Sequence, residues 1–146
     1  MMAWEPIALA QDADLPLILA VFNRYPSQLI PISASQLATY HRKEQVYWDS
    51  GIAMIARMMP VKSYLKYWLP PDTWHLNMIA SSRQRKGAAD EFMVRFLWQT
   101  HGRIVLSVYP FNIRAIKFYK KHGFRKVGEY NWPSFTVDVY QHGGDV

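Results

Sequence analysis

A glycine turn between an apolar strand and an amphipathic helix constrains this chain most. Residues 73–80 are predicted to form a strand, and Gly87 opens a helix whose apolar positions recur every three or four residues to about Thr100. The connection passes straight from strand to helix, so its backbone N–H groups are free to point at an anion. The helix start adds about half a positive charge there. The segment therefore predicts a layered fold of strands and helices that holds an anionic ligand at this turn.

The side chains of the turn favour the same ligand. Gly87 lets the backbone approach an anion closely, and the small residues Ala88 and Ala89 keep that approach open. Three further side chains add full positive charges: Arg83, Arg85 and Lys86. No Lys-Ser/Thr pair follows the glycine and the turn contains only one glycine, so it matches neither a Walker loop nor a Rossmann fingerprint.

A second helix is predicted about 28 residues further on, from Asn112 to residue 121. Asn112 and Tyr119 are spaced so that they share one helix face with residues 115–116 between them. Gly123 is expected to end this helix in a left-handed cap. Residues 104–108 are an apolar run typical of a buried strand, so the central part of the chain has the order strand, helix, strand, helix.

The flanking parts of the chain predict further strands and two more helices. Helices are expected from Asp12 or Asp14 to Tyr25, and from Ser33 or Ser35 toward residue 43. Strands are expected at residues 6–10, 45–48, 52–59, 124–130 and 135–140, with a hairpin over residues 49–51. Residues 61–69 fit either a strand or a helix.

Strict alternation is predicted for the strand at residues 73–80. One face is expected to carry Trp74, Leu76, Met78 and Ala80. The other face is expected to carry His75, Asn77 and Ile79. The whole pattern predicts one α/β domain of the mixed α+β kind over residues 1–146. Its central sheet is mixed and partly antiparallel, with helices on both sides.

Composition limits the class of protein. Half of the residues are apolar and 15% are aromatic, which predicts a folded domain. The chain has no cysteine, which excludes disulfides, thiolate metal sites and a cysteine acyl-enzyme. The net charge of +6 raises nucleic-acid binding as an alternative, but the charges form no patterned tract and also suit a polyanionic cofactor. The apolar run at residues 15–22 is too short to span a membrane, and we expect a cytoplasmic protein.

The two helix motifs together resemble those of the GNAT N-acetyltransferase superfamily. The resemblance covers about residues 73–124 and rests on the cofactor loop Gln84-Arg85-Lys86-Gly87-Ala88-Ala89 and the later run from Asn112 to Tyr119. It implies acetyl-CoA as co-substrate, with the pyrophosphate at that loop. The family's pantetheine arm would pair with the main chain of Met78, Ile79 and Ala80 and with the side chain of Asn112.

The resemblance also implies direct attack of a primary amine on the thioester in a ternary complex. Tyr119 matches the family tyrosine that protonates the leaving thiolate, a task that suits a phenol of unperturbed pKa about 10. An alkylamine is only about 0.1% neutral at pH 7, so a general base would help. His75 is the first candidate, since some arylalkylamine N-acetyltransferases place a catalytic histidine at this offset; Asp72, Asp138 or a water chain are alternatives.

Several features of function stay open at this level. The acceptor is a small-molecule amine or a peptide, and its pocket would include some of Tyr25, Tyr40, Tyr47, Trp48 and Trp132. A non-catalytic acyl-CoA-binding domain of the same fold, acting through a partner, is the alternative function. Dimers are frequent in the family, so a homodimer is a further expectation. The five histidines lack the spacing of a metal site, and no metal is expected.

Overall fold

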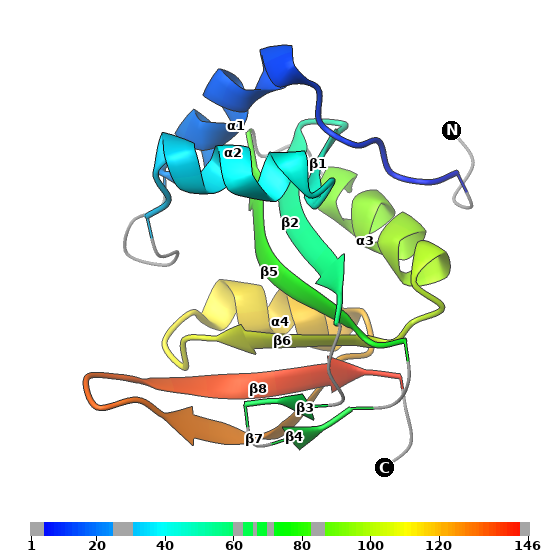
Figure 1. Cartoon of the computed structure of the whole chain (residues 1–146). Coiled ribbons are helices and arrows are strands. Elements are labelled where there is room, and N and C mark those ends of the chain that lie inside the picture. The colour runs from blue at the N-terminus through cyan, green and yellow to red at the C-terminus, as the bar shows by residue number, and fades with distance from the viewer. Residues whose placement is uncertain are drawn as a thin grey trace.

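The computed structural model describes residues 5–24, 31–59, 63–65, 67–69, 72–82 and 87–143, which form helices around one central sheet (Figure 1). The helices are α1 (Leu15–Phe22), α2 (Ala34–Arg42), α3 (Ala88–Gln99) and α4 (Ile113–Lys121). The strands of the sheet are β1 (Val46–Asp49), β2 (Ile52–Met58), β5 (Trp74–Ser81), β6 (Ile104–Val108), β7 (Arg125–Asn131) and β8 (Thr136–His142). A separate hairpin consists of β3 (Ser63–Tyr64) and β4 (Tyr67–Trp68).

The six-stranded sheet has the order β1-β2-β5-β6-β8-β7. Its β5–β6 pair is parallel, and every other neighbouring pair is antiparallel. The parallel pair follows from the chain order, because α3 connects the two strands as a crossover on one face. The prediction of a mixed, partly antiparallel sheet is confirmed.

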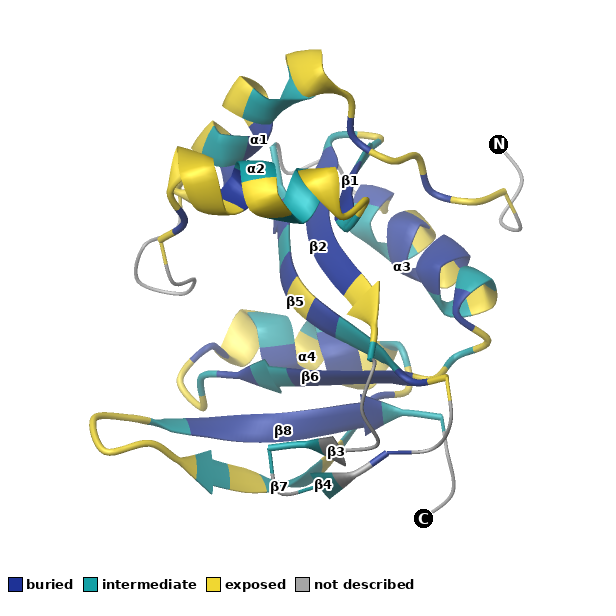
Figure 2. Cartoon of the chain, in the orientation of Figure 1, coloured by how far each residue is buried: buried dark blue, intermediate teal, exposed yellow. Residues whose placement is uncertain are grey.

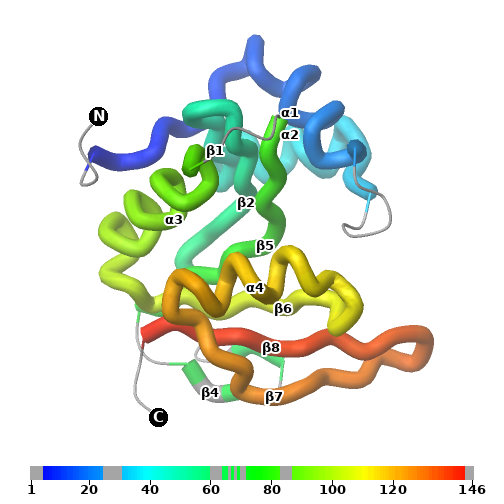
Figure 3. The backbone as a smooth tube through the Cα atoms, turned by 180° about the vertical axis from the view of Figure 1, so that it is seen from behind, coloured from blue at the N-terminus to red at the C-terminus, as the bar shows by residue number. Residues whose placement is uncertain are grey.

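Helices cover both faces of the sheet, as predicted. Figures 1 and 3 show α3 and α4 on one face, with α1 and α2 at the opposite face of the β1-β2-β5 half. The buried side chains divide accordingly. Phe92 and Phe96 of α3 belong to the larger core, whereas Phe22 of α1 and Leu37 of α2 belong to a second core across the sheet. Figure 2 shows buried stretches on the inner sides of the helices and along β2, β6 and β8.

Local capping explains where several elements begin and end. Ser33 caps α2 by accepting a hydrogen bond from Gln36 N at 3.1 Å, and the Gln36 side chain accepts one from Ser33 N at 2.8 Å. Gly123 has a φ of 88° after α4, as the sequence predicts. Asp14 precedes α1 but its side chain makes no cap bond to that helix; it accepts a hydrogen bond from Gln11 N instead.

One segment differs from its predicted form, and a second adopts one of its two predicted alternatives. Residues 6–10 form no strand, only an isolated bridge between Leu9 and Tyr47 with neighbouring hydrogen bonds to β1. Residues 61–69, which fit strand or helix in the sequence, contain the β3–β4 hairpin in their described part. The end of the first helix near Tyr25 lies outside the described residues, and α1 ends at Phe22.

The predicted alternation of β5 is wrong, because the strand contains a β-bulge at Asn77. Ile55 of β2 is paired with Met78, and the next residue, Ala56, is paired with Leu76. Asn77 therefore has no partner residue in β2. Trp74 and Leu76 consequently face the core beneath α3 and α4. After the bulge the phase is reversed, so Met78 and Ala80 face the core beneath α1 and α2.

A buried ion pair connects the start of the described chain to the sheet and α3. Arg95 of α3 is 2% exposed, and its Nη2 donates to Asp49 Oδ2 at 2.8 Å and to the carbonyl oxygen of Pro6 at 2.9 Å. Its Nε donates to the carbonyl oxygen of Glu5 at 3.1 Å. Burial raises the pKa of Asp49, but hydrogen bonds from Arg95, Ala8 and Ser50 outweigh burial, and the net pKa is below its ordinary value.

Candidate active site

The site begins with an opening in the sheet between β5 and β6. The two strands are paired only at Trp74–Ile104 and His75–Val105, and then they diverge (Figure 1). β5 continues to Ser81. Within the described residues, the edge of β5 that faces β6 therefore has no neighbouring strand after His75. Unpaired N–H and C=O groups on such an edge can bind an extended ligand as a further strand would.

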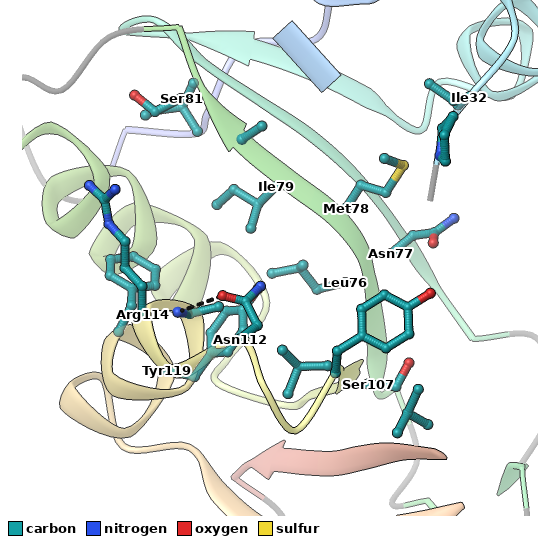
Figure 4. Close-up of a pocket in the computed structure, with 18 of the residues that line it drawn as sticks. Ile32, Leu76, Asn77, Met78, Ile79, Ser81, Ser107, Asn112, Arg114 and Tyr119 are labelled. Atoms are coloured by element: carbon teal, nitrogen blue, oxygen red, sulfur yellow. Dashed lines mark hydrogen bonds between the residues drawn. The ribbon is translucent and has the colours of Figure 1, made fainter. Parts of the chain in front are cut away.

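A cavity of about 590 Å³ occupies this opening. Figure 4 shows Asn112 and Tyr119 across the cavity from β5, with Ser81 and Arg114 toward one end and Ile32 and Asn77 toward the other. Six residues predicted for the site line it: Met78, Ile79, Ala80, Ala89, Asn112 and Tyr119. Gly87, Ala88 and His75 are not on its wall. The predicted loop residues Gln84, Arg85 and Lys86 lie outside the described residues.

One end of the cavity meets the N-terminus of α3. Gly87 is the N-cap residue, with a left-handed φ of 84°, which glycine adopts without strain. A Cβ atom at Gly87 would meet no described atom within 4 Å, so the space above the turn is open. The first N–H groups of a helix have no partner inside the helix, and here they follow directly from that turn. The helix start can therefore bind an anion.

Asn112 differs in detail from its predicted place on the helix. It is the N-cap of α4 and is 8% exposed, and its Oδ1 accepts a hydrogen bond from Ala115 N at 3.2 Å (Figure 4). The cap fixes the side chain against the cavity and uses the oxygen. Nδ2 is the donor that remains to reach a ligand in the cavity.

Tyr119 lies on the inner face of α4 and is 7% exposed. Its ring packs against Phe118 and Phe124, with centroids 5.8 and 5.5 Å away. Burial raises the pKa of Tyr119 above its usual value near 10, so the phenol is protonated at neutral pH. Phe118 is half-buried, whereas Tyr119 both belongs to the larger core and lines the cavity.

His75 lies on the opposite face of β5 from Trp74 and Leu76. Its ring centroid is 4.7 Å from that of Tyr64. Tyr64 lines the cavity and His75 does not, so His75 lies behind the wall, in contact with Tyr64. Burial, with a smaller contribution from the positive charge of Arg57, lowers the pKa of His75 to about 4. The imidazole is therefore neutral at pH 7 and a weak base.

The two carboxylates considered as alternative bases are also away from the cavity wall. Asp72 is exposed before β5, and Asp138 of β8 forms an ion pair with Lys126 at 3.4 Å. Neither of them lines the cavity. Neither carboxylate is therefore placed to take a proton directly from a ligand in the cavity.

Solved structures of acetyltransferases have this same arrangement of elements. The chain is similar to Ard1 from Thermoplasma volcanium, with a TM-score of 0.70 and 17% identity over 92% of this chain and 94% of that one. It is similar to a chain of the NatC complex bound to Gag peptide and CoA, with a TM-score of 0.67 and 14% identity over 94% of each chain. The protein has the GNAT fold.

A third similar structure is Arabidopsis thaliana Naa50 in complex with the bisubstrate analogue CoA-Ac-MVNAL. Its TM-score is 0.60 at 17% identity, over 92% of this chain and 95% of that one. No protein-family model and no curated protein sequence matches the chain. The GNAT fold is therefore established here by three-dimensional similarity across nearly the whole length.

The far end of the GNAT-fold cavity contains polar residues that the sequence did not single out. Tyr64 donates a hydrogen bond to Ser107 Oγ at 3.0 Å, and Asn77 Nδ2 donates to the Tyr40 hydroxyl at 3.1 Å. Tyr64 lies in residues 61–69, which fit either a strand or a helix, so the sequence pattern did not predict the position of its side chain. Ser107 did give a signal, since it is the one polar residue in the apolar run of β6.

Of the five aromatic residues considered for an acceptor pocket, Tyr40 and Trp132 line the cavity. Tyr47 is buried in the larger core, Trp48 packs against the second core, and Tyr25 lies outside the described residues. Among the described residues no three His, Asp or Glu side chains lie together as a metal site requires. None of the described helices is both long and apolar enough to span a membrane.

Proposed function

We propose that the protein is an N-acetyltransferase that transfers the acetyl group of acetyl-CoA to a primary amine in a ternary complex. The observation that carries the proposal is the cavity in the sheet opening. It extends from the region of the α3 N-terminus, past Tyr119, to a second end on the other face of the sheet. Two substrates could therefore enter from opposite ends and meet at Tyr119.

The described residues fit coenzyme A at the first end. The N-terminus of α3 offers N–H donors to a pyrophosphate, and Ala89 and Arg114 line the adjoining wall. The free edge of β5 at Met78–Ala80 and the Asn112 amide offer polar groups to the pantetheine arm. The basic residues Arg85 and Lys86, with Gln84 beside them, are proposed contacts from the sequence alone.

Acetyl-CoA supplies an acetyl thioester, whose carbonyl carbon forms the new C–N bond as its C–S bond breaks. Tyr119 is proposed to donate its phenolic proton to the leaving sulfur, because its hydroxyl belongs to a buried, protonated phenol on the cavity wall. A backbone N–H on the free edge of β5 can stabilise the charge on the carbonyl oxygen. The proton lost by the amine leaves by water, with His75 proposed as a more distant participant.

Two of the similar structures support a peptide or amine acceptor. The NatC structure is described with a Gag peptide and CoA, and that of Naa50 with an analogue that joins CoA to a short peptide. Both therefore hold a peptide and the coenzyme together, in the same fold and over nearly the same length. The acceptor of this protein is proposed to enter at the second end of the cavity, beside Tyr40 and Tyr64.

The direct test measures free thiol release from acetyl-CoA by the purified chain, with a panel of amines and peptides. We expect release that depends on both substrates, and an acetylated amine detected by mass spectrometry. A parallel thermal shift with coenzyme A reports binding without turnover. Binding with no acetylated product from any acceptor would contradict the proposal and favour a non-catalytic acyl-CoA-binding domain.

A further inference from the structure

The chemistry of the second end of the cavity indicates what kind of acceptor it takes. Its wall is largely apolar and aromatic, from Ile32, Tyr40, Tyr64, Leu65, Trp132 and Phe135. The polar atoms among them are uncharged hydroxyls and amides, including those of Asn77 and Ser107. Such a wall stabilises an apolar group and offers hydrogen bonds, but no charge, to the acceptor.

No carboxylate in the described part of the chain lines this cavity. The two carboxylates next in sequence to wall residues form ion pairs elsewhere, Asp90 with Lys121 and Asp138 with Lys126. Among the residues outside the described ranges, Asp145 near the end of the chain is the only Asp or Glu in the sequence. A second ammonium group on the acceptor would therefore lose its hydration here without gaining a counter-charge.

The same lack of carboxylates affects the reacting amine itself. It must lose its proton without a ready base nearby. Burial raises the pKa of Tyr64 on the wall and so keeps its phenol protonated, and burial lowers the pKa of His75 behind Tyr64. A peptide α-amino group, of pKa about 7.7–8.0, is roughly 15% neutral at pH 7, whereas an alkylamine near 10.4 is about 0.1% neutral or less. An α-amino group is thus far less dependent on a base.

Beyond the cavity mouth an aromatic surface continues outward. Tyr109 lines the cavity, and its ring stacks on Phe111 at 5.0 Å and meets Phe135 edge-on at 5.9 Å; Trp132 lies 6.0 Å from Phe135. Phe111 is 64% exposed, and Trp132 is 43% exposed. Figure 1 shows the β6–α4 connection and the β7–β8 turn, which carry these rings, on the same side of the molecule. A contiguous exposed aromatic patch next to a cavity indicates a ligand that extends past the mouth.

We propose that the acceptor is the N-terminal α-amino group of a polypeptide whose first residues are apolar and uncharged. Its amine reaches Tyr119, its first side chains occupy the uncharged wall, and the following residues lie along the aromatic surface of Tyr109, Phe111, Trp132 and Phe135. The inference rests on the proposed function and names the substrate class of the same site.

The test compares acceptors with the full chain and saturating acetyl-CoA. The probes are a peptide beginning Met-Leu, the same peptide beginning Met-Lys, an N-terminally blocked lysine peptide, phenethylamine and spermidine. We expect α-amino acetylation of the Met-Leu peptide with kcat/KM at least about tenfold above every other probe, since an unpaired desolvated charge costs more than 1.4 kcal/mol. Faster acetylation of any other probe would overturn this inference and leave the proposed function intact. Binding of coenzyme A without turnover of any probe would overturn both.

A gain-of-function variant tests the missing carboxylate directly. Gln36 lines the cavity, and its side-chain oxygen accepts a hydrogen bond from Ser33 N, which a glutamate can also accept. Gln36→Glu should raise kcat/KM for the Met-Lys peptide about two- to fivefold, the range of a partly exposed ion pair, without improving the Met-Leu peptide. Ser35→Glu adds the same charge one residue away and off the wall, and should change neither. An equal gain in both variants, or none in Gln36→Glu, would overturn the inference.

Discussion

Tyr119 combines two properties that usually belong to different residues. It is buried in the larger core between Phe118 and Phe124, and it also lines the cavity. Among the described residues its hydroxyl has no hydrogen-bond partner, so the oxygen is available to a ligand. The packing fixes the ring, and the raised pKa keeps the phenol protonated, so a proton is present where a leaving thiolate would form.

Tyr119→Phe should therefore separate packing from chemistry. Only a hydroxyl is lost, so the melting temperature and the affinity for coenzyme A should barely change. We expect kcat to fall by about 10²- to 10⁴-fold, the usual effect of removing a general acid. Tyr130→Phe, which removes a hydroxyl away from the cavity, should leave kcat unchanged. A Tyr119→Phe enzyme within about threefold of wild type in kcat would exclude the acid role.

His75 should affect stability in a defined pH range. Its folded pKa of about 4 is below the unfolded value near 6.5, so between these values the unfolded chain binds a proton that the folded chain does not. The free energy of unfolding should consequently rise with pH across this window, by on the order of 3 kcal/mol, and level off above it.

Urea unfolding at several pH values from 4.5 to 7.5 measures this contribution, where His75→Gln should flatten the rise. His101→Asn changes an exposed histidine, and asparagine tolerates its φ of 55°. This control should keep the wild-type slope. An unchanged slope in His75→Gln would show that other groups cause the acid sensitivity. Since His75 is neutral above pH 6.5, we also expect its loss to leave the pH profile of kcat/KM unchanged from pH 7 to 9.

At the scale of elements, the glycine turn before α3 has the clearest testable role. Gly87→Glu places a negative charge at the helix N-terminus, where an anion is proposed to bind, and should abolish the rise in melting temperature caused by coenzyme A. Gly87→Ala is the matched control. Its Cβ meets no described atom within 4 Å, so it should lower the stability of the free protein by about 1 kcal/mol through the positive φ but keep most of the shift. A shift of full size in Gly87→Glu would remove this turn from the cofactor site.

Most elements could be predicted from sequence because their signals are local. The Ser33 cap, the turn over residues 49–51 and the glycine after α4 each act within a few residues, and each is found where predicted. The bulge at Asn77 could not be predicted, because it depends on the register between β5 and β2, which are distant in sequence. The relation of His75 to the cavity depends on that bulge and on Tyr64, so spacing alone could not determine it.

At the scale of the whole molecule, the Arg95–Asp49 pair holds three parts of the chain together. It links α3, the end of β1 and the backbone of residues 5–6. Asp49→Ala leaves a buried guanidinium without its counter-charge and should lower the free energy of unfolding by about 3–5 kcal/mol. Lys121→Ala breaks the exposed pair with Asp90 and should have a much smaller effect.

The pH dependence of the same pair provides a second measurement. Because the folded pKa of Asp49 is lowered, its stabilisation is present above the unfolded pKa near 3.9 and is lost as the pH falls through the folded value. Chemical unfolding from pH 2 to 6 should show this acid-linked loss in the wild type and less of it in Asp49→Asn. Equal acid sensitivity in both proteins would assign the loss to other carboxylates.

The single extra residue at Asn77 has a consequence for the length of β5. A bulge absorbs one extra residue locally, so the residues after it keep their pairing with the neighbouring strand. Ile55 and Ala53 of β2 pair with Met78 and Ala80, and this pairing needs no residue between Leu76 and Met78. Deletion of Asn77 should therefore restore regular pairing and leave Met78 and Ala80 on the face opposite Leu76. The strand can thus change in length by one residue without changing which side chains it presents to each core.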